Sequence, residues 1–118
     1  MDVKLADLAK RIRRFIDNRD WHQFHEPKDL AISLSLEAAE VLEHFQWKSK
    51  EEVDKKALGK ELADVLYWVI LMSDDLGIEL GDVFEQKMLE NEKKYPVSKA
   101  KGSKKKYTQL KNENKASK

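Results

Sequence analysis

The chain has 118 residues, of which 38% are charged and 41% hydrophobic, with four Gly, two Pro and no Cys. This length fits a single domain, and the lack of Cys excludes a disulfide framework and thiolate chemistry. No apolar run approaches the roughly 20 residues that span a bilayer. Because no apolar signal segment opens the sequence either, we expect a cytoplasmic protein.

The near-neutral net charge of +1 conceals an asymmetry. Residues 97–118 contain 8 Lys and one acid, which leaves residues 1–96 acidic overall. An acidic body is a poor surface for nucleic acid, so we expect no nucleic-acid partner. We therefore predict a helical catalytic domain over residues 1–97 and a Lys-rich flexible tail over residues 98–118.

Apolar residues recur at helical spacing along most of the chain, which predicts an all-α fold. The first helix is expected over residues 3–18, followed by a loop over residues 19–28. Asp29 is placed to cap a second helix that ends near Gln46. The inward face of the first helix is predicted to carry Leu5, Leu8, Ile12, Phe15 and Ile16.

The second half of the chain contains clear start and stop signals for helices. Residues 49–52, Ser-Lys-Glu-Glu, form a capping-box pattern that predicts a short helical stretch. A third helix is expected over residues 58–76, with Gly77 just beyond its end. A fourth is expected over residues 81–95 and is stopped by Pro96.

Two predicted helices carry acidic pairs at i, i+3 spacing, Glu37 with Glu40 and Glu61 with Asp64. Such spacing places both carboxylates of a pair on one helix face, where like charges repel. Both pairs border apolar stripes, so packing of those stripes would bring four carboxylates together. Four oxygen ligands suit Mg²⁺, with Mn²⁺ as a substitute. Spacing alone leaves a solvated acidic face open as the alternative.

The wider pattern resembles the MazG-like nucleoside triphosphate pyrophosphohydrolases. The two acidic motifs match that family's signature, and residues 19–27 and 45–48 resemble segments of its dCTP pyrophosphatase branch. Residues 87–96 and 102–108 resemble that branch's last helix and C-terminal stretch. The resemblance covers about residues 5 to 110.

This resemblance implies a four-helix all-α bundle completed by dimerisation, commonly as a dimer of dimers. It implies Mg²⁺ held by Glu37, Glu40, Glu61 and Asp64, which would also be the catalytic residues. It further implies hydrolysis of a nucleoside triphosphate to a monophosphate and pyrophosphate, with dCTP or modified dCTP as substrate. The apolar surface expected on the third helix independently favours a homo-oligomer, a dimer or a tetramer.

Several aromatic and polar residues are candidates for the nucleotide pocket, because aromatic rings can stack on a base. Ordinary core packing is the alternative for each aromatic, and surface exposure is the alternative for Lys87 and Asn91. In the resembled branch the segment matching residues 21–25 lines the nucleotide site, and only His25 among the three histidines inherits a substrate role by position. A surface or otherwise satisfied side chain is the alternative for each histidine. The predicted substrate-binding set is Trp21, His22, Gln23, Phe24, His25, Trp47, Trp68, Lys87 and Asn91.

Two positions depart from the resembled branch, since Trp68 stands where a Tyr is expected and Ile12 where a His is expected. Both changes bear on base preference. A di-iron carboxylate bundle is a rival class, but its Glu-x-x-His motif does not occur here, since the residue three before His44 is Val41. Anaerobic iron loading with no optical signature would close that option. A non-catalytic helical oligomerisation module with a basic tail stays open as an alternative.

Overall fold

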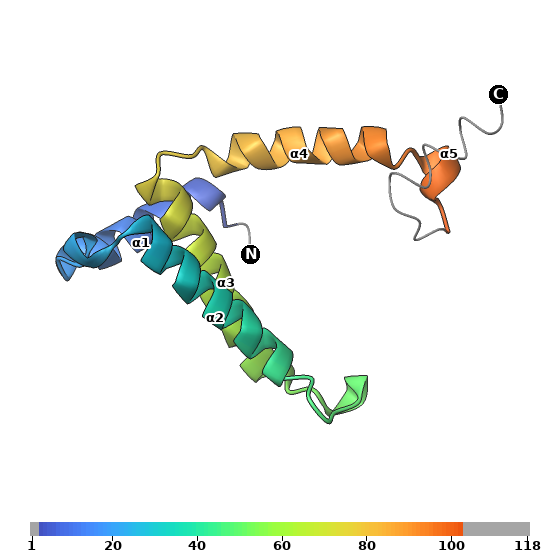
Figure 1. Ribbon diagram of the computed structural model, residues 1–118, viewed down its shortest axis with the longest axis horizontal. Helices are drawn as coiled ribbons and strands as arrows, with labels where there is room; N and C mark the ends of the chain where they lie inside the picture. Colours follow the sequence, from blue (N-terminus) through green and yellow to red (C-terminus); the bar gives the residue numbers. More distant parts are fainter. Residues whose placement is uncertain (1–2, 103–118) are drawn as a thin grey trace. The chain divides into compact units, whose positions relative to one another are not determined.

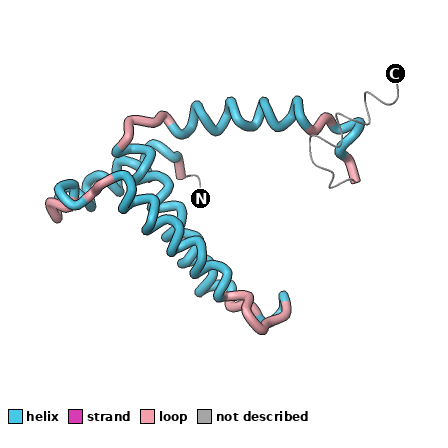
Figure 2. The backbone as a smooth tube through the Cα atoms, in the orientation of Figure 1, coloured by secondary structure: helices cyan, strands magenta, loops and turns pink. Residues whose placement is uncertain are grey.

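The computed structural model describes residues 3–102, which are helical and contain no strand (Figures 1 and 2). The chain divides into two compact units, residues 1–79 and residues 80–118. The elements are α1 (Leu5–Asn18), a 3-10 helix (His22–Phe24), α2 (Pro27–Glu43), a second 3-10 helix (Lys50–Glu52), α3 (Lys55–Asp75), α4 (Leu80–Lys94) and α5 (Val97–Ala100). The all-α prediction is confirmed.

The first unit is built around α2 and α3, which lie side by side as a helical hairpin, with α1 packed against α3 (Figure 1). Its core is small: Ile16, Leu30 and Leu71 are buried together. Ile12, Tyr67, Trp68 and Met72 pack partly buried against this core. The aromatic residues near the core therefore belong to the same apolar stripes that hold the three helices together.

The start and end of α2 differ from the sequence-based prediction. Asp29 does not cap the helix, because Pro27 already occupies its first position and Asp29 lies inside the first turn. A Pro is favoured there, since that position needs no backbone donor. The helix ends at Glu43, not Gln46, because the backbone hydrogen bonds shorten to i→i−3 through residues 44–46 and Trp47 takes a left-handed φ of 64°.

The helix α3 begins three residues earlier than predicted, because Asp54 caps it by accepting a hydrogen bond from the Ala57 amide at 3.0 Å. The predicted capping box at residues 49–52 does not form. A 3-10 turn is present, but the Ser49 hydroxyl bonds the Glu52 carboxylate rather than a backbone amide.

The predicted stop at Gly77 is confirmed. Gly77 has a φ of +69° and donates to the Asp74 carbonyl, while the Ile78 amide donates to the Ser73 carbonyl. These two bonds form a Schellman motif, which needs a residue that tolerates left-handed φ.

The second unit contains α4, which ends before Pro96 as expected, and the short helix α5. The helix α5 was not predicted, and all of it except Val97 falls in residues assigned to the flexible tail. Residues 103–118, which hold most of that predicted tail, lie outside the described residues. Among the described helices, none is long and apolar enough to cross a membrane. The cytoplasmic location stays a prediction.

Candidate functional site

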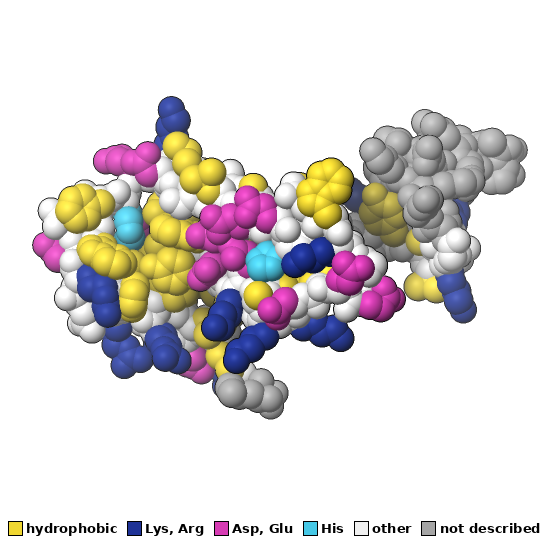
Figure 3. Space-filling model, turned by 90° about the horizontal axis from the view of Figure 1, so that it is seen from below, with side chains coloured by type: hydrophobic (Ala, Val, Ile, Leu, Met, Phe, Trp, Pro, Cys, Tyr) yellow, Lys and Arg dark blue, Asp and Glu magenta, His cyan; other side chains and the backbone are white. Residues whose placement is uncertain are grey.

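Acidic side chains from α2 and α3 meet where the two helices run side by side. Glu37, Glu61 and Asp64 each place a carboxylate oxygen within 4.8 Å of the others. Glu40 lies one turn further along α2, close enough to act on both Glu37 and Glu61. Figure 3 shows acidic side chains gathered beside a hydrophobic patch on one face of the molecule. The convergence expected from the two i, i+3 pairs is therefore present in the fold.

The electrostatics of this carboxylate cluster (Glu37, Glu40, Glu61 and Asp64) are unfavourable without a cation. Proton sharing with Glu61, then burial, then the nearby Glu40 raise the pKa of Glu37 to about 7. The pKa of Glu61 is also raised, chiefly through Glu40. Like charges at short range disfavour ionisation of each neighbour. Between the ordinary carboxyl pKa and about pH 7, the folded protein therefore keeps a proton on Glu37 that an unfolded chain would release.

The donor atoms of the cluster fit a hard divalent cation. One oxygen of Glu37 (Oε2) and one of Glu61 (Oε1) are buried and have no hydrogen-bond partner. Such unpaired buried oxygens are costly, and a cation would satisfy them. An all-oxygen set of this kind suits Mg²⁺ or Mn²⁺ better than a softer metal.

The raised pKa of Glu37 predicts a specific pH dependence of stability. Because the folded state holds the proton more tightly than the unfolded chain, this stabilisation is complete below the ordinary carboxyl pKa and is lost as pH rises through about 7. In metal-free protein, the melting temperature of the wild type should therefore fall relative to Glu37→Gln between about pH 4.5 and 7.5. Mg²⁺ should reduce this difference. Parallel curves for the two proteins, measured by calorimetry, would contradict it.

A pocket of about 560 Å³ opens beside the cluster. Its walls are largely apolar and aromatic, and Glu37 and Asp64 supply carboxylates at its edge. The other lining residues are Leu8, Arg11, Ile12, Phe15, Trp21, His25, Tyr67 and Trp68. A concave apolar site with a few converging polar groups is typical of small-molecule binding.

The pocket contains three of the predicted substrate-binding residues, Trp21, His25 and Trp68. Trp21 is 41% exposed and meets Phe15 edge to face, with ring centroids 5.6 Å apart. His25 is nearly buried. Trp68 follows Asp64 by one turn of α3, as the sequence predicted, and both line the same pocket.

Other predicted substrate-binding residues lie outside this lining. Phe24 and Trp47 are exposed, Trp47 by 99%. Gln23 bonds the carbonyl and carboxylate of Asp20. His22 contacts the carboxylates of Asp17 and Asp75.

The two remaining candidates, Lys87 and Asn91, lie on α4 in the second unit. Their i, i+4 spacing places them on one helix face. Lys87 forms an exposed ion pair with Glu90 at 3.6 Å. Their part in a nucleotide site stays a prediction.

Sequence reasoning missed three residues near the site. Arg11 and Tyr67 line the pocket, and His44 Nε2 lies 3.7 Å from Glu61 Oε2. Arg11 is one of three arginines within four residues, so spacing alone does not single it out. Its helical register with Leu8 and Phe15 was the available signal, since residues three and four apart share a face.

Comparison with known proteins agrees with this geometry. A model of the MazG-like family matches residues 32–110. The chain is 36% identical over 114 residues to dCTP pyrophosphatase 1 of mouse, covering 90% of this chain and 67% of that protein. The human protein of the same name is 34% identical, with the same coverage. The fold is similar to the crystal structure of a pyrophosphatase from Archaeoglobus fulgidus, with a TM-score of 0.71 and 37% identity over 81% of this chain and 95% of that one.

Proposed function

This chain belongs to the MazG-like family, and on that premise we propose that it is a metal-dependent nucleoside triphosphate pyrophosphohydrolase acting on dCTP or modified dCTP. Such an enzyme removes unwanted nucleotides from the pool. The observation that carries the proposal is the convergence of carboxylates from two helices, with unpaired buried oxygens, at the edge of an aromatic pocket.

The carboxylate cluster would hold Mg²⁺ through Glu37, Glu61 and Asp64, with Glu40 as the fourth carboxylate. The cation would offset the repulsion between acidic side chains and a polyanionic triphosphate, stabilise charge on phosphoryl oxygens and promote ionisation of the attacking water. Manganese, with the same preference for oxygen, would be a substitute.

The protein itself supplies positioning. Trp21 and Trp68 bring aromatic rings to the pocket on which a pyrimidine base could stack, while Arg11 would offer a positive charge to phosphate oxygens in the same pocket. A carboxylate of the cluster would orient the water. The water oxygen would form a bond to the α-phosphorus as its proton passes to that carboxylate, and the bond from this phosphorus to the oxygen bridging to the β-phosphorus would break. The products are a monophosphate and pyrophosphate.

The cleavage position can be tested with dCTP and Mg²⁺ in ¹⁸O-labelled water, with products analysed by mass spectrometry. Attack on the α-phosphorus places the label in dCMP and leaves pyrophosphate unlabelled. Label in pyrophosphate, or orthophosphate as the direct product, would contradict the proposed reaction. No turnover over a panel of canonical and modified dNTPs would favour the non-catalytic oligomerisation module.

Self-association is a further part of the proposal. Among the described residues only four hydrophobic side chains are buried, whereas α2 and α3 expose large apolar ones. Leu36 is 62% exposed, Leu42 63% and Leu62 51%. Exposed apolar surface on this scale marks an interaction surface.

We therefore expect at least a dimer, and a tetramer is favoured by the family resemblance. Light scattering at micromolar concentration should give a mass of two or four times the 13.8 kDa chain. Replacing Leu36 and Leu62 with Gln should shift that mass downwards if these side chains lie in the interface. A monomeric mass for the wild type would overturn this expectation.

A further inference from the structure

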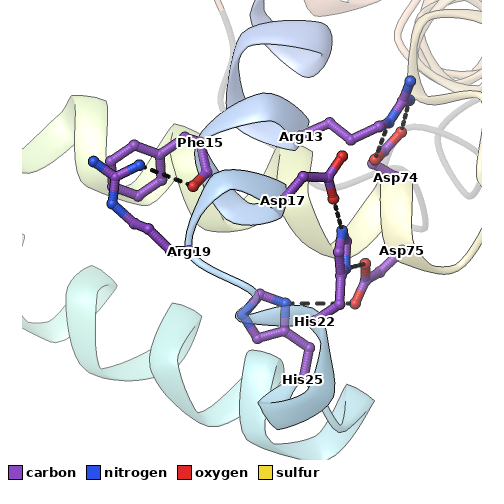
Figure 4. A network of polar contacts seen from close by, with 8 residues as sticks. All are labelled: Arg13, Phe15, Asp17, Arg19, His22, His25, Asp74 and Asp75. Atoms are coloured by element: carbon purple, nitrogen blue, oxygen red, sulfur yellow. Dashed lines mark hydrogen bonds and ion pairs between the residues drawn. The ribbon is translucent and has the colours of Figure 1, made fainter.

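A second group of possible metal ligands lies away from the carboxylate cluster. His22 and His25, in the segment between α1 and α2, meet Asp75, the last residue of α3 (Figure 4). Each offers one ligand atom, and these three atoms lie within 4.8 Å of one another. Nothing in the proposed hydrolysis requires this grouping.

The distances in this His–Asp cluster (His22, His25 and Asp75) approach those of a tetrahedral metal site. His22 Nδ1 lies 3.3 Å from Asp75 Oδ1, and His25 Nδ1 lies 3.8 Å from Asp75 Oδ2. Zinc bonds to nitrogen and oxygen are about 2.0–2.2 Å, which makes the edge of a tetrahedron about 3.3–3.6 Å. Both imidazole-to-carboxylate distances are thus within a few tenths of an ångström of that edge length.

His25 supplies an independent observation that points to a ligand. Its side chain is nine-tenths buried, and its Nδ1 atom is buried without a hydrogen-bond partner. The 3.8 Å separation from Asp75 is too long for a hydrogen bond. An unpaired buried nitrogen is costly, and a cation between it and Asp75 would give it a partner.

His22 is oriented as metal-bound histidines are. Its Nε2 lies 2.7 Å from Asp17 Oδ1, while its Nδ1 points towards Asp75 (Figure 4). A proton on Nε2 donated to Asp17 leaves the Nδ1 lone pair free. A carboxylate behind the far ring nitrogen is the usual partner of a ligating histidine, because it fixes the tautomer and the ring orientation.

Asp74, the acid next to Asp75, does not compete with it for the two histidines. Asp74 is paired with Arg13, which bonds both of its oxygens. The pairing lowers the pKa of Asp74 and keeps it ionised beside the guanidinium. Asp75 is thus the acid left to face the two imidazoles.

We propose that His22, His25 and Asp75 form a transition-metal site that takes Zn²⁺, separate from the Mg²⁺ site of the carboxylate cluster. Two nitrogens and one oxygen suit Zn²⁺ rather than Mg²⁺. The fourth position would be taken by water, since His22 is 43% exposed. Because His25 also lines the nucleotide pocket, the bound metal would tie that wall of the pocket to the end of α3.

The test measures Zn²⁺ binding by calorimetry in chelator-treated protein with excess Mg²⁺. The background is the double variant Glu37→Gln/Asp64→Asn, which weakens the carboxylate cluster as a competing zinc site. We expect one Zn²⁺ per chain in this background, and a loss of at least 100-fold in affinity on adding His22→Gln. Asp17→Asn should weaken binding by about 10- to 100-fold, as expected for loss of a carboxylate behind a ligating histidine.

The matched control is His44→Gln, the remaining histidine of the chain, which lies near Glu61 and should leave zinc affinity unchanged. Circular dichroism of the zinc-free variants checks the fold. A readout that leaves all three histidines in place is the imidazole nitrogen NMR spectrum of the same Glu37→Gln/Asp64→Asn background: Zn²⁺ should shift the His22 and His25 signals and leave the His44 signal unchanged. Absence of zinc binding, equal binding with and without His22, or unshifted His22 and His25 signals would overturn the proposal.

Discussion

Replacing Glu37 with Gln should lower kcat for dCTP by about 10³-fold or more in saturating Mg²⁺, with the fold retained. Glu37 combines an unpaired buried oxygen with a pKa raised to about 7, so its ionised carboxylate would be stabilised by a bound cation. The amide keeps the shape of the side chain but loses its negative charge. Asp64→Asn should act similarly, because Asp64 belongs to the same three-carboxylate group.

These variants should be less active than the wild type but, in the absence of metal, more stable. Removing one of several mutually repelling acids should raise the melting temperature of metal-free protein near neutral pH. Added Mg²⁺ should then stabilise the wild type more than Glu37→Gln, because ligand binding to the folded state alone raises stability. Glu43→Gln is the matched control, an exposed acid on the same helix whose replacement should change neither property. Full activity of Glu37→Gln would remove Glu37 from the catalytic set.

The convergence of the acidic side chains was predictable, because the i, i+3 spacing places each pair on the helix face that also carries the apolar residues. Glu37 and Glu61 border apolar stripes, and packing of α2 on α3 brings them together. The end of α3 at Gly77 was predictable for a local reason, since a Schellman motif needs left-handed φ. In both cases the sequence pattern lies within one helix or at its end, so the local backbone geometry is enough to predict the structure.

Features that depend on competing local bonds were not predictable. The pattern at Ser49 suits a capping box, yet the stronger cap at Asp54 starts α3. Asp29 suits a cap as well, but Pro27 starts α2 two residues earlier. When two start signals lie within a few residues, their spacing does not decide which one the backbone uses.

The pocket was only partly predictable because its wall and the core share one apolar stripe. Phe15 was expected to face inward, but it is 39% exposed and lines the pocket instead. The His–Asp cluster was missed for a different reason. Asp75 lies far along the chain from His22, and only the packing of α1 and the following segment on α3 joins them.

Trp21 provides the second large expected effect. Its indole lines the pocket, is supported edge to face by Phe15, and is 41% exposed, so its removal costs little core packing. Stacking of a base on an aromatic ring contributes about 1–3 kcal/mol. Trp21→Ala should therefore lower kcat/KM for dCTP by about 5- to 150-fold, since each 1.36 kcal/mol is a factor of ten.

The variant Trp21→Phe separates stacking from structure, because it keeps an aromatic face and should restore most of the lost kcat/KM. Trp68→Ala is less suitable, since Trp68 also packs against the core.

Assays of Trp21→Ala with dCTP, CTP, dTTP, dUTP and dATP then show whether the preference among bases changes as well as the rate. A pocket that only stacks distinguishes bases by about 1–3 kcal/mol, whereas lost hydrogen bonds cost more. Equal losses for every base in Trp21→Ala would mean that Trp21 holds bases without selecting them. No loss for any of them would place the base elsewhere, and Trp47→Ala, at the fully exposed indole that the sequence also predicts for substrate binding, is the variant that would then locate it.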